Sequence, residues 1–130
     1  MASLSDAQLN TLRNSLKQRY AKLRKDIAEE LARSEQEHYA DLAGRVHDIG
    51  EESVADLLSD LNIAELDREI NEVRDVEAAL QRINMGSYGL CEMCGEPIGF
   101  ERLQSQPAAR RCVACQKKWE HSHGQTTPRL

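Results

Sequence analysis

The sequence predicts an all-α protein: an antiparallel two-helix coiled-coil hairpin, followed by a small C-terminal module that four cysteines organise. Three observations predict this class. Apolar residues recur every three or four positions along most of residues 9–83, which is typical of amphipathic helices. The 130 residues include one Phe, one Trp and three Tyr, too few aromatic side chains for a thick globular core. All four cysteines lie between residues 91 and 115.

The first predicted helix begins after Ser5 and has one narrow apolar stripe. Ser5 is a suitable N-cap because Gln8 follows three residues later, in the register of a capping box. Neither Pro nor Gly occurs in residues 5–43, so we expect one uninterrupted helix of roughly 33 residues, ~50 Å long. The stripe weakens beyond residue 31, over Ser34, His38 and Leu42. Its main positions are Leu9, Leu12, Leu16, Tyr20, Leu23, Ile27 and Leu31.

A second helix of similar length is predicted between Ser53, its N-cap, and Gly86, which is suited to end a helix. Its stripe consists of Val54, Leu57, Leu58, Leu61, Ile63, Leu66, Ile70, Val73, Val76, Leu80 and Ile83. A narrow stripe has to be buried against another one, so we expect residues 1–86 to form a coiled-coil hairpin with its tip near residues 44–52. The alternative is that the stripes pair with a helix of another protein.

The cysteines follow the pattern C-x2-C-x17-C-x2-C, which is typical of a structural zinc site. Zn²⁺ binds four thiolates tetrahedrally, and a filled site of this kind leaves no open position for a substrate. We therefore expect one structural Zn²⁺ per chain and, because no catalytic constellation is visible, no enzyme. The alternatives are a thiol redox pair, ordinary buried thiols, or another ligand arrangement that includes His121 or His123. The expected ligands are Cys91, Cys94, Cys112 and Cys115.

This pattern defines a C4 zinc finger with a short terminal helix over residues 87–120, and residues 121–130 are expected to form a flexible tail. Four thiolates on Zn²⁺ leave a net charge of −2, which nearby cations can offset. The cations that flank the second cysteine pair are Arg110, Arg111, Lys117 and Lys118.

Composition narrows the possible partners and locations. The formal net charge is −5, whereas a DNA-coating surface needs a basic excess, so we expect no direct specific DNA binding. No stretch approaches the ~20 apolar residues of a membrane span. The opening MASLSDAQLN has no apolar segment typical of a secretory signal. We expect a cytoplasmic monomer with no membrane contact, whose reduced thiols bind metal rather than form disulfides.

Residues 88–120 resemble the C4 zinc-finger segment of the DksA/TraR family of bacterial transcription regulators. The run G-x-C-x-x-C-G-x-x-I-G-x-x-R-L, the later P-x-A and the second C-x-x-C all match. The resemblance extends over roughly residues 10–120 and is to a short member, without the longer N-terminal region of other members. It implies a protein that binds bacterial RNA polymerase rather than DNA, through the secondary channel, with an acidic hairpin tip near the catalytic centre.

The resemblance also assigns the tip residues. Family tips have two aspartates spaced D-x-x-D; Asp48 matches the first, Glu51 replaces the second, and Glu52 follows. Without the resemblance, these acids would be read as a solvated loop and a helix start. Three further functions stay open: a stress-linked or phage/plasmid-type polymerase binder with a different tip effect, a thiol/zinc redox sensor, and a nucleic-acid-binding zinc ribbon.

Members of the family often act together with guanosine tetraphosphate. Arg68 matches a basic position on the second helix, and it is the candidate residue to face this alarmone. Asp75 and Gln116 stand where the family has lysines. A polyphosphate would be repelled there, so we expect a weak or absent alarmone response.

Overall fold

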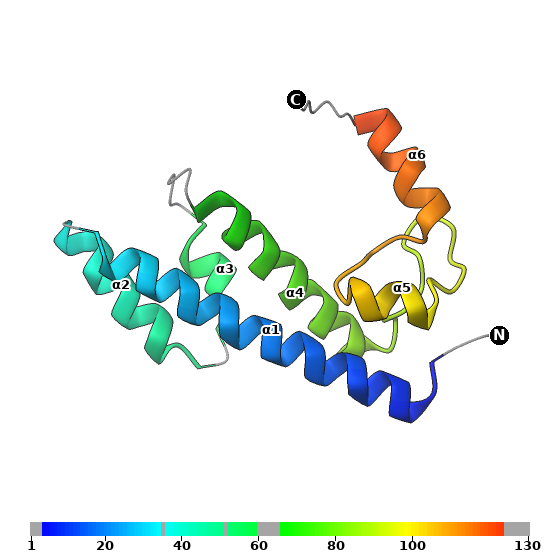
Figure 1. Cartoon of the computed structure of the whole chain (residues 1–130), viewed down its shortest axis with the longest axis horizontal. Coiled ribbons are helices and arrows are strands. Elements are labelled where there is room, and N and C mark those ends of the chain that lie inside the picture. Colours follow the sequence, from blue (N-terminus) through cyan, green and yellow to red (C-terminus); the bar gives the residue numbers. More distant parts are fainter. Residues whose placement is uncertain (1–3, 35, 51, 60–65, 124–130) are drawn as a thin grey trace.

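The computed structural model describes residues 4–34, 36–50, 52–59 and 66–123, and within these ranges it contains six α-helices and no β-strand (Figure 1). The predicted all-α class is therefore confirmed. Residues Leu90 and Pro97 form an isolated β-bridge in the loop that follows the fourth helix. The helices are α1 (Asp6–Ala32), α2 (Glu37–Asp48), α3 (Val54–Leu57), α4 (Asp67–Met85), α5 (Phe100–Ser105) and α6 (Val113–His123).

Helix α1 begins with the capping box that the sequence predicts. The Gln8 backbone N–H donates to Ser5 Oγ at 3.1 Å, and the Ser5 N–H donates to Gln8 Oε1 at 3.0 Å. These two bonds satisfy donors that would otherwise be unpaired at the helix start. The predicted apolar stripe faces the core, and its buried members on α1 are Leu12, Leu16, Leu23, Ile27 and Leu31.

Helices α1 and α4 run antiparallel, as predicted, so that the start of α1 lies beside the end of α4 (Figure 1). Arg19 donates two hydrogen bonds to the Glu72 carboxylate, at 2.5 and 2.7 Å, across this pair. Gly86 ends α4 with a φ of 82°, a left-handed conformation that glycine adopts without a Cβ clash. The side chains that α4 buries are Ile70, Val73, Val76, Ala79 and Ile83.

The first predicted helix is not continuous, which corrects the expectation of one helix of about 33 residues. Helix α1 ends at Ala32, and α2 runs back along the second half of α1, so the chain reverses before the predicted tip at 44–52 (Figure 1). The apolar stripe explains this reversal. The stripe is polar at position 34 and becomes apolar again at Leu42 and Val46. Because the chain reverses, these two side chains are buried in the same core as the stripe of α1.

The second predicted helix also differs from the expectation. Ser53 caps a helix as predicted, since its Oγ accepts the Asp56 backbone N–H at 2.9 Å. This helix, α3, spans only Val54–Leu57, and the long helix α4 begins at Asp67. The predicted stripe positions Leu61 and Ile63 lie outside the described residues.

The C-terminal module lies at the end of the helical body where α1 begins and α4 ends (Figure 1). Leu103 of α5 is fully buried, and a Cβ placed on Gly89 would lie 3.2 Å from the Leu4 side chain. This close packing fixes the base of the module against the body. Helix α6 points away from the body and continues to His123, and the rest of the expected tail lies outside the described residues.

None of the helices described in this structure is both long enough and apolar enough to span a membrane.

Candidate metal centre

The structure brings the four predicted cysteines together. Their Sγ atoms all lie within 4.8 Å of one another, and Cys94 Sγ lies 3.9 Å from Cys112 Sγ. Four sulfurs at ~2.3 Å from a tetrahedral zinc are about 3.8 Å apart, so the observed spacing fits this ion. The arrangement of Cys91, Cys94, Cys112 and Cys115 is therefore consistent with one structural Zn²⁺.

Two local turns position these sulfurs. The first cysteine pair forms a knuckle in which the Gly95 N–H donates to the Cys91 carbonyl at 2.9 Å. Gly95 has a φ of 77°, so a residue with a Cβ would be strained at this turn. The second pair opens α6, where the Gln116 N–H donates to the Cys112 carbonyl at 2.8 Å. Each C-x2-C pair thus presents its sulfurs toward the other pair.

The backbone around the site prepares Cys91 to ionise. Burial acts to raise the pKa of Cys91, but backbone N–H groups of Cys112, Cys94 and Met93 stabilise its thiolate and lower the pKa to about 6. A hydrogen bond with the Cys112 sulfur and burial raise the pKa of Cys115 to about 12. Such a set of thiols cannot ionise together unless a cation binds, and a zinc-bound thiol is deprotonated outright.

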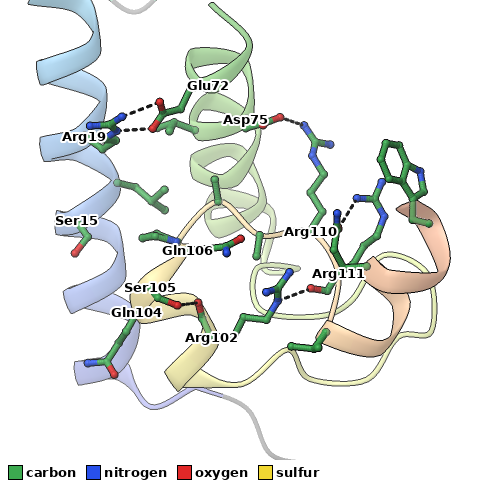
Figure 2. Close-up of a pocket in the computed structure, with 18 of the residues that line it drawn as sticks. Ser15, Arg19, Glu72, Asp75, Arg102, Gln104, Ser105, Gln106, Arg110 and Arg111 are labelled. Atoms are coloured by element: carbon green, nitrogen blue, oxygen red, sulfur yellow. Dashed lines mark hydrogen bonds and ion pairs between the residues drawn. The ribbon is translucent and has the colours of Figure 1, made fainter. Parts of the chain in front are cut away.

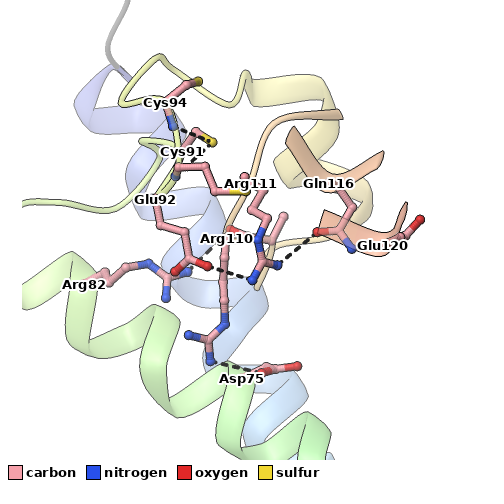
Figure 3. A network of polar contacts seen from close by, with 11 residues as sticks. Asp75, Arg82, Cys91, Glu92, Cys94, Arg110, Arg111, Gln116 and Glu120 are labelled. Carbon is pink, nitrogen blue, oxygen red and sulfur yellow. Dashed lines mark hydrogen bonds and ion pairs between the residues drawn. The ribbon is translucent and has the colours of Figure 1, made fainter. Parts of the chain in front are cut away.

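The finger is attached to α4 by polar contacts as well as by its apolar base. Arg110 pairs with Asp75 of α4 at 3.1 Å, and Arg82 Nη2 donates to the Ala109 carbonyl at 3.4 Å (Figure 3). The Tyr88 hydroxyl donates to the Pro107 carbonyl at 2.8 Å. The sequence predicts that Arg110 offsets the charge of the zinc site, whereas in the structure its guanidinium pairs with Asp75 of α4.

An open groove of about 1070 Å³ separates the finger from α1 and α4 (Figure 2). Asp75 and Gln116, which replace family lysines, both line this groove, whereas Arg68 does not. Arg68 is exposed in the first turn of α4. Arginines of the same chain already engage both groove residues: Arg110 pairs with Asp75, and Arg111 donates to Gln116.

The end of α2, with the predicted tip residue Asp48, lies beside Arg24 in the second half of α1 instead of at the far end of a hairpin. Asp48 ends α2, where its side chain is 83% exposed. Glu52 is exposed in the turn before α3, and Glu51 lies outside the described residues. Asp48, Glu52 and Asp56 line an open groove of about 760 Å³. The structure therefore brings two of the three tip candidates to one exposed acidic surface.

Two side chains that sequence reasoning missed hold this acidic segment against the body. Arg24 of α1 donates to the carbonyls of Val46 and Ile49, at 2.9 and 2.7 Å, at the end of α2. Glu77 of α4 accepts hydrogen bonds at the start of α3, from the Ser53 hydroxyl at 2.6 Å. Each contact joins residues more than 20 positions apart, so no local motif could indicate it.

Comparisons with known proteins agree with the zinc site. Residues 86–121 match the model of the prokaryotic dksA/traR C4-type zinc finger. Over 86 residues, 66% of this chain, the sequence is 36% identical to the RNA polymerase-binding transcription factor DksA of Caulobacter vibrioides, and it covers 56% of that protein. It is 43% identical over 63 residues to general stress protein 16O of Bacillus subtilis, covering 48% of this chain and 37% of that one.

The fold agrees as well. The solved structure of transcription factor DksA2 from Pseudomonas aeruginosa aligns with a TM-score of 0.59 and 31% identity, over 91% of this chain and 87% of that one. The chain spans only about half the length of the curated relatives above. The four clustered cysteines, the helical body and this alignment, which covers most of both chains, lead to one conclusion: the chain belongs to the DksA/TraR family of C4 zinc-finger proteins.

Proposed function

We propose that this protein is a transcription regulator that binds bacterial RNA polymerase. The observation that supports the proposal most is the similarity to the DksA of Caulobacter vibrioides, whose name describes an RNA polymerase-binding transcription factor. A closed zinc site agrees with a binding protein rather than an enzyme, because four cysteines leave no open position for a substrate.

The proposed binding mode is insertion into the polymerase secondary channel. Affinity comes from the extended surfaces of the helices and the finger, since a stable interface needs about 800 Å² from each partner. The exposed carboxylates of Asp48 and Glu52 contribute little affinity themselves, because exposed charges interact weakly. Near a magnesium ion in the polymerase centre they act strongly, since carboxylates are preferred ligands of hard cations.

The proposal includes a cytoplasmic monomer that binds the polymerase without specific DNA contacts. The net charge of −5 supports it, because phosphate neutralisation requires clustered cations. Two basic side chains of the finger are engaged within the chain: Arg110 pairs with Asp75 and Arg111 pairs with Glu92. A zinc ribbon that binds nucleic acid would need these groups free.

The acidic segment provides a test that separates regulation from binding. Asp48→Asn combined with Glu51→Gln keeps the side-chain shapes and removes two charges. We expect this variant to compete with other secondary-channel factors for polymerase as well as wild type does, but not to alter promoter output in purified transcription. The control is Asp41→Asn, which removes an exposed carboxylate from the same helix, α2.

Wild-type regulation by the double variant would contradict the assigned role of the acidic segment. Loss of polymerase binding by this variant would contradict the proposal that the acidic segment is needed for regulation but not for affinity.

The exposure of one zinc ligand supports a second candidate function, a thiol-based redox sensor. Cys94 is exposed, whereas Cys91 and Cys115 are buried. Oxidation of an accessible thiolate ligand would release zinc and loosen the finger. Zinc release measured against peroxide dose distinguishes this candidate, since a purely structural site loses zinc only at doses that oxidise proteins generally.

A further inference from the structure

Arg111 contacts more elements of the finger than any cysteine-flanking residue that the sequence singles out. Its Nη2 atom lies 2.8 Å from Glu92 Oε2, and its Nη1 atom donates to Gln116 Oε1 at 3.1 Å (Figure 3). The guanidinium also lies over the Trp119 ring, 4.4 Å from its centroid. Only 13% of the Arg111 side chain is exposed.

These contacts join both halves of the zinc site. Glu92 follows Cys91 in the first knuckle, and Arg111 immediately precedes Cys112 in the second. The Glu92 backbone N–H also donates to the Arg110 carbonyl at 2.9 Å, so the two knuckles are linked by a main-chain bond beside the ion pair. Neither the ion pair nor the main-chain bond involves the metal site. Both connect the first cysteine knuckle to the second, which are the same two segments that a bound zinc ion would connect.

The same side chain fixes the direction of α6. Gln116 and Trp119 lie in the first two turns of α6. Cys115 is on the same helix, and in the sequence it lies after Arg111 and before Gln116. Arg102 of α5 holds the backbone of Arg111 in place, because the Arg102 Nε atom donates to the Arg111 carbonyl at 2.9 Å. Arg111 therefore holds Glu92, α5 and α6 in one arrangement.

The chemistry of this position requires arginine. A guanidinium is planar, and it can donate in its plane to a carboxylate and an amide while one face stacks on an aromatic ring. A lysine ammonium has one nitrogen and no flat face, so it could keep the ion pair with Glu92 but not the other two contacts together. The observed geometry uses both terminal nitrogens and the face of the guanidinium at once, whereas the buried Nε has no hydrogen-bond partner among the described residues.

We propose that Arg111 is the positioning residue of the zinc centre: through Glu92, Gln116 and Trp119 it holds the two cysteine knuckles in register, so that zinc binds tightly and leaves slowly. The physical reason is preorganisation. A metal that has to gather loose ligands loses affinity to the ordering of the chain, whereas contacts around the ligands that hold them in place reduce this cost. Removing such an outer contact typically lowers metal affinity by about 10- to 100-fold.

The test measures zinc affinity by chelator competition, and the zinc release rate in excess chelator, on the full chain. We expect Arg111→Leu and Arg111→Lys to bind zinc about 10- to 100-fold more weakly and to release it correspondingly faster. The matched control is Arg110→Leu. It removes a charge of the same sign from the neighbouring position, where the Arg110 side chain pairs with Asp75. The zinc affinity of this variant should stay within about threefold of wild type.

Two further measurements distinguish positioning from general stabilisation. With zinc in excess, urea unfolding of the helical body should be the same for wild type and Arg111→Lys. Glu92→Gln should weaken zinc binding in the wild-type background but add little in Arg111→Leu, because both changes remove one contact. If Arg111→Leu does not fold, Arg111→Lys and Glu92→Gln still decide the question.

The proposal is overturned if Arg111→Lys binds zinc as wild type does, because charge alone would then suffice. It is also overturned if Arg110→Leu loses as much affinity as Arg111→Leu, or if the effects of Glu92→Gln and Arg111→Leu simply add.

Discussion

At the scale of single residues, Glu77 shows how one carboxylate can join three helices. It accepts the Tyr20 hydroxyl of α1 at 2.7 Å, and at the start of α3 it accepts the Ser53 hydroxyl and the Val54 N–H. The negative charge also suits the start of a helix, where backbone N–H groups point outward. Glu77 thus holds the beginning of α3, next to the acidic segment, on the body formed by α1 and α4.

Tyr20 makes this arrangement sensitive to alkaline pH. Burial and the hydrogen bond to Glu77 raise the pKa of Tyr20 to about 12, above its usual value of 10.0. A raised pKa in the folded state means that the stabilisation is complete below pH 10.0 and is lost as the pH rises toward 12.

Urea unfolding of wild type and Tyr20→Phe across this range tests the assignment. At pH 8 we expect the variant to be about 1 kcal/mol less stable, because it lacks a half-buried hydrogen bond to a carboxylate. Toward pH 12 this difference should shrink, because only wild type loses the Tyr20 contribution. Stability curves that remain parallel up to that pH would contradict the assigned role of the Tyr20–Glu77 bond. Tyr88, whose pKa burial also raises to about 12, is present in both proteins and cancels in the comparison.

How much could be predicted differs between residues for a physical reason. The Ser5 and Ser53 caps and the Gly86 stop depend on neighbours within a few positions, so the sequence displays them directly. The four cysteines are recognisable because they form two matched C-x2-C pairs. Arg24, Glu77 and Arg111 act on groups brought near by folding. An arginine or glutamate on an exposed helix face looks the same in a sequence whether or not such a partner exists.

At the scale of elements, the stripe of α1 was predictable but its end was not. Periodicity identified the buried face and the antiparallel pairing with α4. It did not identify the break after Ala32, because no Pro or Gly occurs there and residues 33–36 have no strong stop signal. The break instead follows from packing: reversing the chain buries Leu42, Ala43 and Val46 in the core that includes the α1 stripe.

The groove between α4 and the finger determines the expected alarmone response. Asp75 on α4 and Gln116 on α6 line this groove, and Arg110 and Arg111 already bind them. A polyphosphate would meet the carboxylates of Glu72, Asp75 and Glu120, which all line this groove, and it would have to displace these internal pairs. We predict weak or absent potentiation by guanosine tetraphosphate through this protein.

The measurement is purified transcription with a polymerase that lacks its own alarmone site, with and without guanosine tetraphosphate. A matched variant, Asp75→Lys combined with Gln116→Lys, places basic groups in the groove and should respond more strongly than wild type. Strong synergy with the wild-type chain would show that the groove does not exclude the alarmone.

At the scale of the whole molecule, the zinc finger and the acidic segment are separated. The finger packs on the end of the body where α1 begins, whereas Asp48 ends α2 close to the Arg24 contacts in the second half of α1 (Figure 1). Helix α1 is the element common to both regions, and it contacts α2, α4 and α5. A partner that binds this protein along α1 would therefore meet the finger at one end and the acidic surface further along.

The central claim is that this molecule binds RNA polymerase, and direct binding tests it best. The zinc-loaded chain, labelled at its amino terminus so that the cysteines stay intact, is titrated with bacterial RNA polymerase core and, in parallel, with promoter DNA. We predict saturable binding of one chain per polymerase, in the micromolar range or tighter (about −8 kcal/mol or more favourable). We also predict weaker binding after zinc removal and no saturable binding to DNA. Salt-dependent binding to DNA without binding to polymerase would contradict the account.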